Sequence, residues 1–168
     1  MLMKVLIFGP SGAGKTYLSK ELRKLGLNSV DTDLIGPLSA WFYGDKKVEY
    51  QENADKDWLD NHSFLWNKEF LKQYLIENSD VYLFGASGNV LDMLDLFDKV
   101  YYLDVPDEVQ DVRLQHESRE NPMGNTQFQR KNAIKWGYEL RNKAKDMGIE
   151  FIDATESPEE IYKRLNAG

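Results

Sequence analysis

The 168-residue chain contains no cysteine and has fewer basic than acidic side chains. The lack of cysteine excludes disulfide frameworks and thiolate metal sites. A formal net charge of -7 disfavours binding to nucleic acid or anionic membranes, because both attract Lys and Arg. No apolar run approaches the ~20 residues that span a bilayer, and no signal-peptide pattern precedes the first predicted strand. We therefore expect a cytoplasmic protein with neither membrane nor nucleic acid as a partner.

One glycine-rich segment carries the strongest chemical signal. Residues 9–16 read Gly-Pro-Ser-Gly-Ala-Gly-Lys-Thr and satisfy G-x-x-x-x-G-K-[ST], the phosphate-binding loop or P-loop. An apolar run precedes it and an amphipathic helical pattern follows. Loop N–H groups and the helix N-terminus attract phosphates, so we expect Lys15 to bind the β and γ phosphates and Thr16 to ligate Mg²⁺. The nucleotide-binding residues expected here are Gly9, Ser11, Gly12, Ala13, Gly14, Lys15, Thr16 and Tyr17.

The predicted elements alternate between strands and helices, which is typical of an α/β protein. We expect strands at 3–8, 28–31, 81–85, 99–104 and 149–153, and helices at 15–25, 58–78, 90–97, 107–119, 128–146 and 158–166. The length suits a single domain over residues 1–168.

Two segments do not fit this framework. Residues 34–60 and 113–130 both begin near the carboxyl ends of predicted strands, where open α/β sheets bind ligands. We expect the first to bind the acceptor and the second to act as a lid. The aromatic residues of the first segment suit a neutral or cationic acceptor, or they form a small local core. They are Trp41, Phe42, Tyr43, Tyr50 and Trp58.

Carboxylates follow the second predicted strand. Asp31 and Asp33 are two residues apart and point the same way if the extended conformation persists. We expect Asp31 to hold a Mg²⁺-bound water and Asp33 to orient or deprotonate an acceptor hydroxyl. The alternative is a turn with an N-cap for a following helix.

Arginines mark the predicted lid. Arg113 and Arg119 lie in a segment that starts helical and is then broken by Asn121-Pro122 and Gly124. Guanidinium groups stack on bases and bind phosphate oxygens. The alternative is a pair of surface arginines that contact nearby glutamates.

With these landmarks, the chain resembles small P-loop kinases of the adenylate kinase and shikimate kinase type. The resemblance implies a three-layer P-loop nucleoside triphosphate hydrolase fold, with a five-stranded parallel sheet in the order 2-3-1-4-5, helices on both faces and a lid. It implies that Arg113 stacks on adenine and that Arg119 contacts the transferred phosphate. It also implies that the loop with Thr155 and Pro158 lines the adenine.

A closer resemblance is to uncharacterised shikimate-kinase-like ATP-binding proteins. It rests on Trp66, on the turn Gly85-Ala-Ser-Gly-Asn89 and on Asn121-Pro-Met-Gly124. Shikimate kinases have three glycines after the third strand and an arginine before it. This chain has Gly85-Ala86-Ser87-Gly88 and no arginine between Arg23 and Arg113. These departures disfavour shikimate and nucleoside monophosphates as acceptors.

We therefore expect an ATP- and Mg²⁺-dependent kinase that phosphorylates a small-molecule hydroxyl or phosphate acceptor, either nucleoside-like or polyol-like. Lys15, Asp33 and Arg119 are its expected catalytic residues, and Thr16 and Asp31 its metal ligands. The missing Asn-Lys-x-Asp pattern favours ATP over GTP. A monomer or homodimer is expected. The alternatives are a nucleotide-dependent switch or ATPase that acts on a protein partner, and a kinase that modifies protein or nucleic acid.

Overall fold

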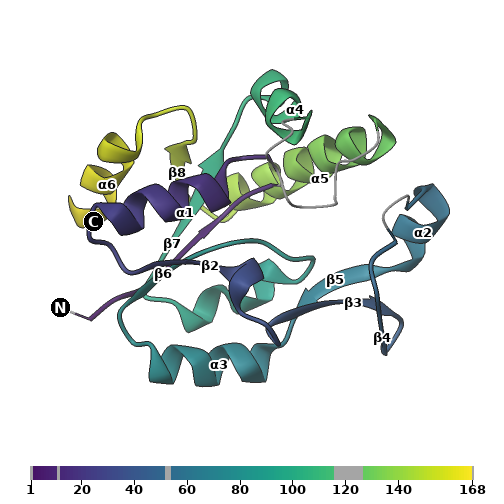
Figure 1. Cartoon of the computed structure of the whole chain (residues 1–168), viewed down its shortest axis with the longest axis horizontal. Coiled ribbons are helices and arrows are strands. Elements are labelled where there is room, and N and C mark those ends of the chain that lie inside the picture. Colours follow the sequence, from purple (N-terminus) through teal and green to yellow (C-terminus); the bar gives the residue numbers. More distant parts are fainter. Residues whose placement is uncertain (1, 11, 52–53, 116–126, 168) are drawn as a thin grey trace.

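A parallel sheet of five strands forms the centre of the protein, in the order β2-β6-β1-β7-β8 (Figure 1). This computed structural model describes residues 2–10, 12–51, 54–115 and 127–167. The strands are β1 (Lys4–Phe8), β2 (Ser29–Asp31), β6 (Val81–Phe84), β7 (Lys99–Asp104) and β8 (Glu150–Asp153). They lie where five strands were predicted. The strand numbers in this order differ from those of the predicted order 2-3-1-4-5, because three strands that were not predicted lie between β2 and β6 in the sequence.

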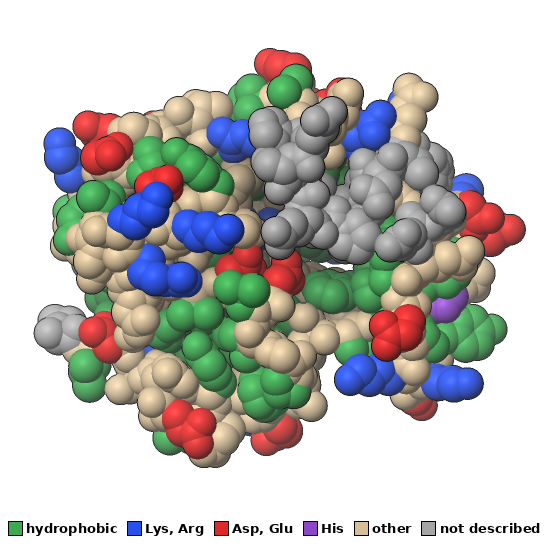
Figure 2. All heavy atoms as spheres, in the orientation of Figure 1, with side chains coloured by type: hydrophobic (Ala, Val, Ile, Leu, Met, Phe, Trp, Pro, Cys, Tyr) green, Lys and Arg blue, Asp and Glu red, His purple; other side chains and the backbone are tan. Residues whose placement is uncertain are grey.

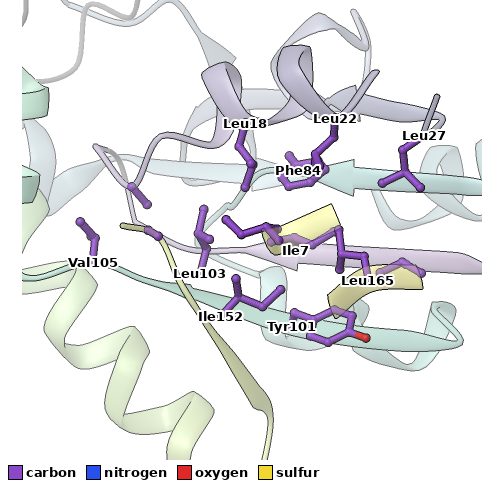
Figure 3. Packing of buried hydrophobic residues seen from close by; sticks show 14 residues of the cluster. Ile7, Leu18, Leu22, Leu27, Phe84, Tyr101, Leu103, Val105, Ile152 and Leu165 are labelled. Atoms are coloured by element: carbon purple, nitrogen blue, oxygen red, sulfur yellow. The ribbon is translucent and has the colours of Figure 1, made fainter. Parts of the chain in front are cut away.

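Helices cover both faces of this sheet (Figure 1). On one face, α1 (Lys15–Lys24) and α6 (Pro158–Ala167) pack on alternate strand residues such as Ile7 and Leu103. Figure 3 shows Leu18 and Leu22 of α1 pointing toward Ile7 and Phe84. The other face is covered by α3 (Lys68–Glu77), the 3₁₀ helix η2 (Val90–Leu96) and α5 (Gln127–Asp146). A parallel sheet buried on both faces requires the continuous apolar strands that the sequence shows.

The predicted helix over 58–78 is wrong. The chain forms α2 (Lys56–Asn61), then strand β5 (Ser63–Trp66), then α3. Asp55 caps α2 by accepting a hydrogen bond from the Trp58 N–H at 3.0 Å. Asn67 caps α3 in the same way, from the Phe70 N–H at 3.1 Å. Each of these N-caps begins a separate helix, and β5 lies between the two helices.

Two other helix predictions change. The helix predicted at 90–97 is the 3₁₀ helix η2. The helix predicted at 107–119 is α4 (Asp107–Gln115), and its predicted last residues lie outside the described part of the chain.

A second, antiparallel sheet was not predicted. It has the order β4-β3-β5, with β3 (Ser39–Tyr43) and β4 (Lys46–Val48) joined by a turn at Gly44. The segment 34–60, which did not fit the predicted framework, thus contains β3, β4 and most of α2. Gly44 has φ of 58°, a left-handed conformation that glycine adopts without strain. We call the described residues from β3 to β5, which include β4 and α2, the small sheet unit.

The side chain of Asn89 joins the small sheet unit to the turn after β6. Its Oδ1 accepts from the Trp66 N–H at 2.9 Å, and its Nδ2 donates to the Trp66 carbonyl at 3.0 Å. The Ser87 hydroxyl donates to the same Oδ1 at 2.8 Å, and the Gly88 N–H donates to the Phe64 carbonyl at 2.7 Å. The Asn89 side chain and the Gly88 N–H thus hold β5 beside the carboxyl end of the central sheet.

Among the described helices, none is both long enough and apolar enough to cross a membrane.

Candidate functional site

The P-loop follows β1 and leads into α1, as predicted. Gly12 and Gly14 have φ of 84° and 90°, and Gly14 is the residue that precedes α1. These left-handed conformations wrap the backbone around the start of the helix. Gly9 has a different constraint, since a Cβ there would lie 2.8 Å from the Leu103 carbonyl oxygen.

Lys15 folds back over this loop. Its Nζ donates to the carbonyls of Gly9 at 2.7 Å and Pro10 at 2.6 Å. The ammonium group therefore lies against the loop backbone at the carboxyl end of β1 and does not extend into solvent. Tyr17, two residues further on, is exposed.

Thr16 and Asp31 meet beside the loop. The Thr16 hydroxyl donates to Asp31 Oδ2 at 2.6 Å, and the Asp31 side chain is buried. The structure thus brings together the two predicted metal ligands, from the start of α1 and the end of β2. Among the described residues, no cluster of three or more His, Asp or Glu side chains could hold a metal alone.

This donor set fits Mg²⁺. A hydroxyl and a carboxylate are hard oxygen ligands, and Mg²⁺ in nucleotide sites usually has one or two protein ligands besides phosphates and waters. Thr16 and Asp31 could supply the protein ligands of such a site.

Asp33 and Asp31 differ in their surroundings. The extended conformation does not persist past β2, because the 3₁₀ helix η1 (Thr32–Leu34) begins at once. Asp31 caps it, with Oδ1 accepting from the Asp33 N–H at 3.0 Å, so the turn-and-cap alternative is also present. The condition for parallel carboxylates is therefore not met. Asp31 is buried against the P-loop and Asp33 is exposed.

Arg113 lies against the P-loop. Its Nη1 donates to the Ala13 carbonyl at 2.6 Å and its Nη2 to the Ala154 carbonyl at 3.2 Å. Ala154 belongs to the turn between β8 and α6. The guanidinium group therefore joins the two segments that were predicted to bind phosphates and adenine.

The β8–α6 turn is organised by Asp153. Its Oδ1 accepts from the Thr155 hydroxyl at 2.6 Å and from the Thr155 N–H at 2.8 Å. These hydrogen bonds, first from the hydroxyl and then from the N–H, lower the pKa of Asp153 below its usual value. Pro158 follows as the first residue of α6. Thr155 and Pro158 thus follow closely in sequence after Ala154, whose carbonyl Arg113 contacts.

The aromatic residues of the small sheet unit pack on one another. The Trp41 ring lies 5.0 Å from Tyr50, 5.2 Å from Trp58 and 5.3 Å from Phe64, between ring centroids. Trp58 also stacks on His62 at 3.8 Å. Burial raises the pKa of the Tyr50 hydroxyl. These half-buried rings pack on one another as the local-core interpretation expects, and the acceptor-binding interpretation stays a prediction.

A hollow lies beside the turn after β6, between η2 and α5. The residues that line it are Ser87, Gly88, Val90, Leu91, Trp136, Glu139, Leu140 and Lys143. On the face shown in Figure 2, acidic side chains lie near the centre, between the part built on the central sheet and the small sheet unit.

Some predicted site residues cannot be placed. Ser11 and Arg119 lie outside the described residues, and so does most of the predicted lid, at 116–126. The ends of the lid segment belong to α4 and α5.

Sequence reasoning gave no role to several residues that organise the site. Asn89 and Trp66 were recognised only as shared landmarks. Gln129, at the start of α5, donates to the Ala54 carbonyl at 3.2 Å, which connects α5 to the small sheet unit. The spacing of Gly85 and Asn89 was the only signal, because the partners lie far away in sequence.

Comparison with solved structures identifies the fold. Over 99% of this chain and 98% of the other, the shikimate kinase of Bacteroides thetaiotaomicron superposes with a TM-score of 0.63 at 17% identity. The shikimate kinase of Acinetobacter baumannii in complex with shikimate gives 0.61 at 17% identity, over 98% and 91%. The deoxyadenosine kinase of M. mycoides gives 0.54 at 18% identity, over 98% and 99%. The fold is that of the small P-loop kinases.

No protein family model matches the sequence. No curated protein matches it either. At these identities the structural likeness shows the fold alone.

Proposed function

We propose that the protein is an ATP-dependent small-molecule kinase that transfers the γ-phosphoryl group to an acceptor hydroxyl. The observation that carries this proposal is the 2.6 Å hydrogen bond between Thr16 and Asp31 beside Lys15 and the P-loop glycines. A P-loop alone binds phosphates, whereas a buried acid on the Thr hydroxyl adds the second part of a metal site. The kinases of the same fold support the same class of reaction.

The predicted site residues have separate tasks in this proposal. The P-loop N–H groups bind the phosphates, and Lys15 exchanges its two loop carbonyls for phosphate oxygens. Thr16 and Asp31 would hold Mg²⁺, which would supply positive charge against the charge that develops on the phosphate oxygens. Asp33 orients the acceptor and takes the proton from its hydroxyl at a carboxylate oxygen. Arg119 is proposed as the cation that contacts the transferred phosphoryl group.

The acceptor is proposed to be a neutral or cationic molecule, such as a nucleoside, a polyol or an amino alcohol. No arginine occurs between Arg23 and Arg113, so this region lacks the guanidinium clamp that suits an anionic acceptor. Cytoplasmic location and a monomeric or homodimeric state complete the proposal.

An ADP-release screen with ATP and Mg²⁺ tests this function. The panel contains nucleosides, nucleotides, sugars, polyols, hydroxy acids and amino alcohols. We expect one acceptor class to raise ADP release well above the rate without acceptor. The increase should disappear in Lys15→Met and fall at least ~100-fold in Asp31→Asn, while both variants keep the wild-type circular dichroism spectrum.

The screen can also contradict the proposal. If Lys15→Met keeps the acceptor-dependent rate, the P-loop is not the donor site. If no acceptor raises the rate but ATP still binds, the nucleotide-dependent switch replaces the kinase.

A further inference from the structure

Arg113 is held by two carbonyl groups from different parts of the chain. One is the carbonyl of Ala13 in the P-loop, at 2.6 Å, and the other is that of Ala154 in the β8–α6 turn, at 3.2 Å. Arg113 is 100 positions from Ala13 and 41 positions from Ala154 in the sequence. The planar guanidinium fork donates in two fixed directions at once, which a lysine ammonium at the same place does not reproduce.

The element that carries Arg113 is itself packed on the P-loop. A Cβ at Gly12 would lie 2.9 Å from Leu114 Cγ and 3.0 Å from the Gln110 carbonyl oxygen. A Cβ at Gly14 would lie 3.0 Å from Arg113 Nη1. Helix α4 therefore contacts the P-loop at both of its left-handed glycines, over one turn of helix.

Helix α5 packs against both α4 and the P-loop. Gln110 is buried and donates to the Ala133 carbonyl at 3.5 Å. A Cβ at Gly137 of α5 would lie 2.7 Å from Pro10 Cβ. Both α4 and α5 thus contact the P-loop, and Arg113 makes the connection to the β8–α6 turn.

We propose that Arg113 is a positioning residue that sets the shape of the P-loop, through the Ala13 carbonyl, before any nucleotide binds. Its effect then reaches every ligand with a polyphosphate chain, including one that has no base. A guanidinium that only stacks on adenine affects ATP alone. The inference rests on the proposed function, because it assigns a role within the same phosphate site.

Inorganic tripolyphosphate separates these two roles because it has the phosphates of ATP and no base. We would measure binding of Mg²⁺–tripolyphosphate and Mg²⁺–ATP by isothermal titration calorimetry, for wild type and Arg113→Lys. The lysine keeps the positive charge and removes the fork, so a loss of affinity reports geometry and not charge. Loss of a hydrogen bond from a charged group corresponds to about a tenfold change in affinity, and we expect that weakening for both ligands.

Arg23→Lys is the matched control. Arg23 lies at the other end of α1 and donates twice to one backbone carbonyl, that of Ser29, at 3.0 and 2.7 Å. The control therefore removes the same kind of arginine–carbonyl contact without touching the P-loop. It should leave both affinities unchanged, even if its melting temperature falls as far as that of Arg113→Lys.

Three outcomes overturn the inference. In the first, Arg113→Lys weakens ATP but binds tripolyphosphate as wild type does, so base stacking is the whole role. In the second, both affinities are unchanged. In the third, Arg23→Lys weakens tripolyphosphate equally, so the effect is one of general stability. If wild type binds neither ligand, the proposed function itself fails, which is a different result from any of these.

Discussion

A close contact between Thr32 and Gly85 determines which residue can begin the turn after β6. A Cβ added to Gly85 would overlap the Thr32 hydroxyl and lie 2.8 Å from Thr32 Cβ. Thr32 is fully buried at the start of η1, next to Asp31, so its backbone has little room to move. The glycine is required by space and not by its backbone conformation, because its φ is not positive.

Gly85→Ala should therefore destabilise the protein by ~1–3 kcal/mol, the usual range for overpacking a core. Urea unfolding measures this value. Adding Thr32→Ala should restore part of the stability, because it removes two of the three clashing atoms and leaves the Cβ. Gly36→Ala is the control, since a Cβ there has no neighbour within 4 Å. Equal effects of the two glycine substitutions would contradict this explanation.

The lowered pKa of Asp153 gives a second prediction for a single residue. Thr155→Val removes the hydroxyl donor and keeps the backbone N–H donor. The pKa of Asp153 should rise part of the way toward its usual value, which carbon-13 NMR titration of its carboxyl group measures. A carboxyl whose pKa is lower in the folded state contributes stability above its unfolded pKa, and this is lost as the pH falls through the folded pKa. That acid-side loss should be smaller in the variant, and an unchanged pKa would show that the hydroxyl has no effect.

The elements differ in how far their own residues determine them. Strands β1, β6 and β7 are apolar runs whose burial on both faces could be predicted from composition alone. Strand β5 was missed because its apolar residues also suit a helix, and periodicity does not distinguish the two over four residues. Its conformation depends on Asn89, which is 23 residues away from Trp66, and no local pattern reports such a contact.

Asn89→Ala tests this dependence. The variant leaves the Trp66 N–H and carbonyl without their partner, at a cost of about 2 kcal/mol in the free energy of unfolding. Hydrogen–deuterium exchange should speed up at Trp66 and through β3, while β1 keeps its protection. Asn67→Ala is the matched control, because it removes the N-cap of α3 and should cost about 1 kcal/mol. Exchange that rises equally in both sheets would indicate that Asn89 does not act on β5 in particular.

At the scale of the whole molecule, the two apolar cores on either side of the sheet include buried tyrosines. Tyr101 lies in one core and Tyr102 in the other. The Tyr102 hydroxyl donates to the Gly137 carbonyl at 3.2 Å, and burial raises its pKa far above the usual value, with Asp104 adding to the effect. Burial also raises the pKa of Tyr50, Tyr74, Tyr82 and Tyr101. The fold therefore holds protons that the unfolded chain releases above pH ~10.

The contribution of these protonated tyrosines to the free energy of unfolding should therefore be fully present below pH ~10. It should be lost as the pH rises beyond that value. Each tyrosine that stays protonated in the folded state adds at most ~1.4 kcal/mol per pH unit to the slope of the free energy of unfolding against pH. Tyr102→Phe should make the slope shallower, although it also loses the hydrogen bond to Gly137. Tyr138→Phe is the control, because that exposed side chain lies on α5 as well. Urea midpoints across the alkaline range measure the slope, and equal slopes in wild type and Tyr102→Phe would contradict this assignment.

The candidate site could be predicted from sequence where its parts are local. The P-loop conformation and the contact of Thr16 with Asp31 follow from one motif and one strand end. The partners of Arg113 could not be predicted, because two backbone carbonyls far apart in sequence carry no residue-type signal. The small sheet unit was missed for the same reason, since its attachments at Asn89 and Gln129 join distant segments.

The contacts of Asn89 and Gly88 also limit how copies of this protein can associate. A strand with free N–H and carbonyl groups at a sheet edge can pair with a strand from another molecule. On β5, the outward groups of Trp66 and the outward carbonyl of Phe64 are already occupied within the chain. At the opposite edge, β4 has three residues, and two of them are exposed lysines. Both edges of the small sheet thus resist strand addition, which protects this aromatic-rich region from aggregating through its backbone.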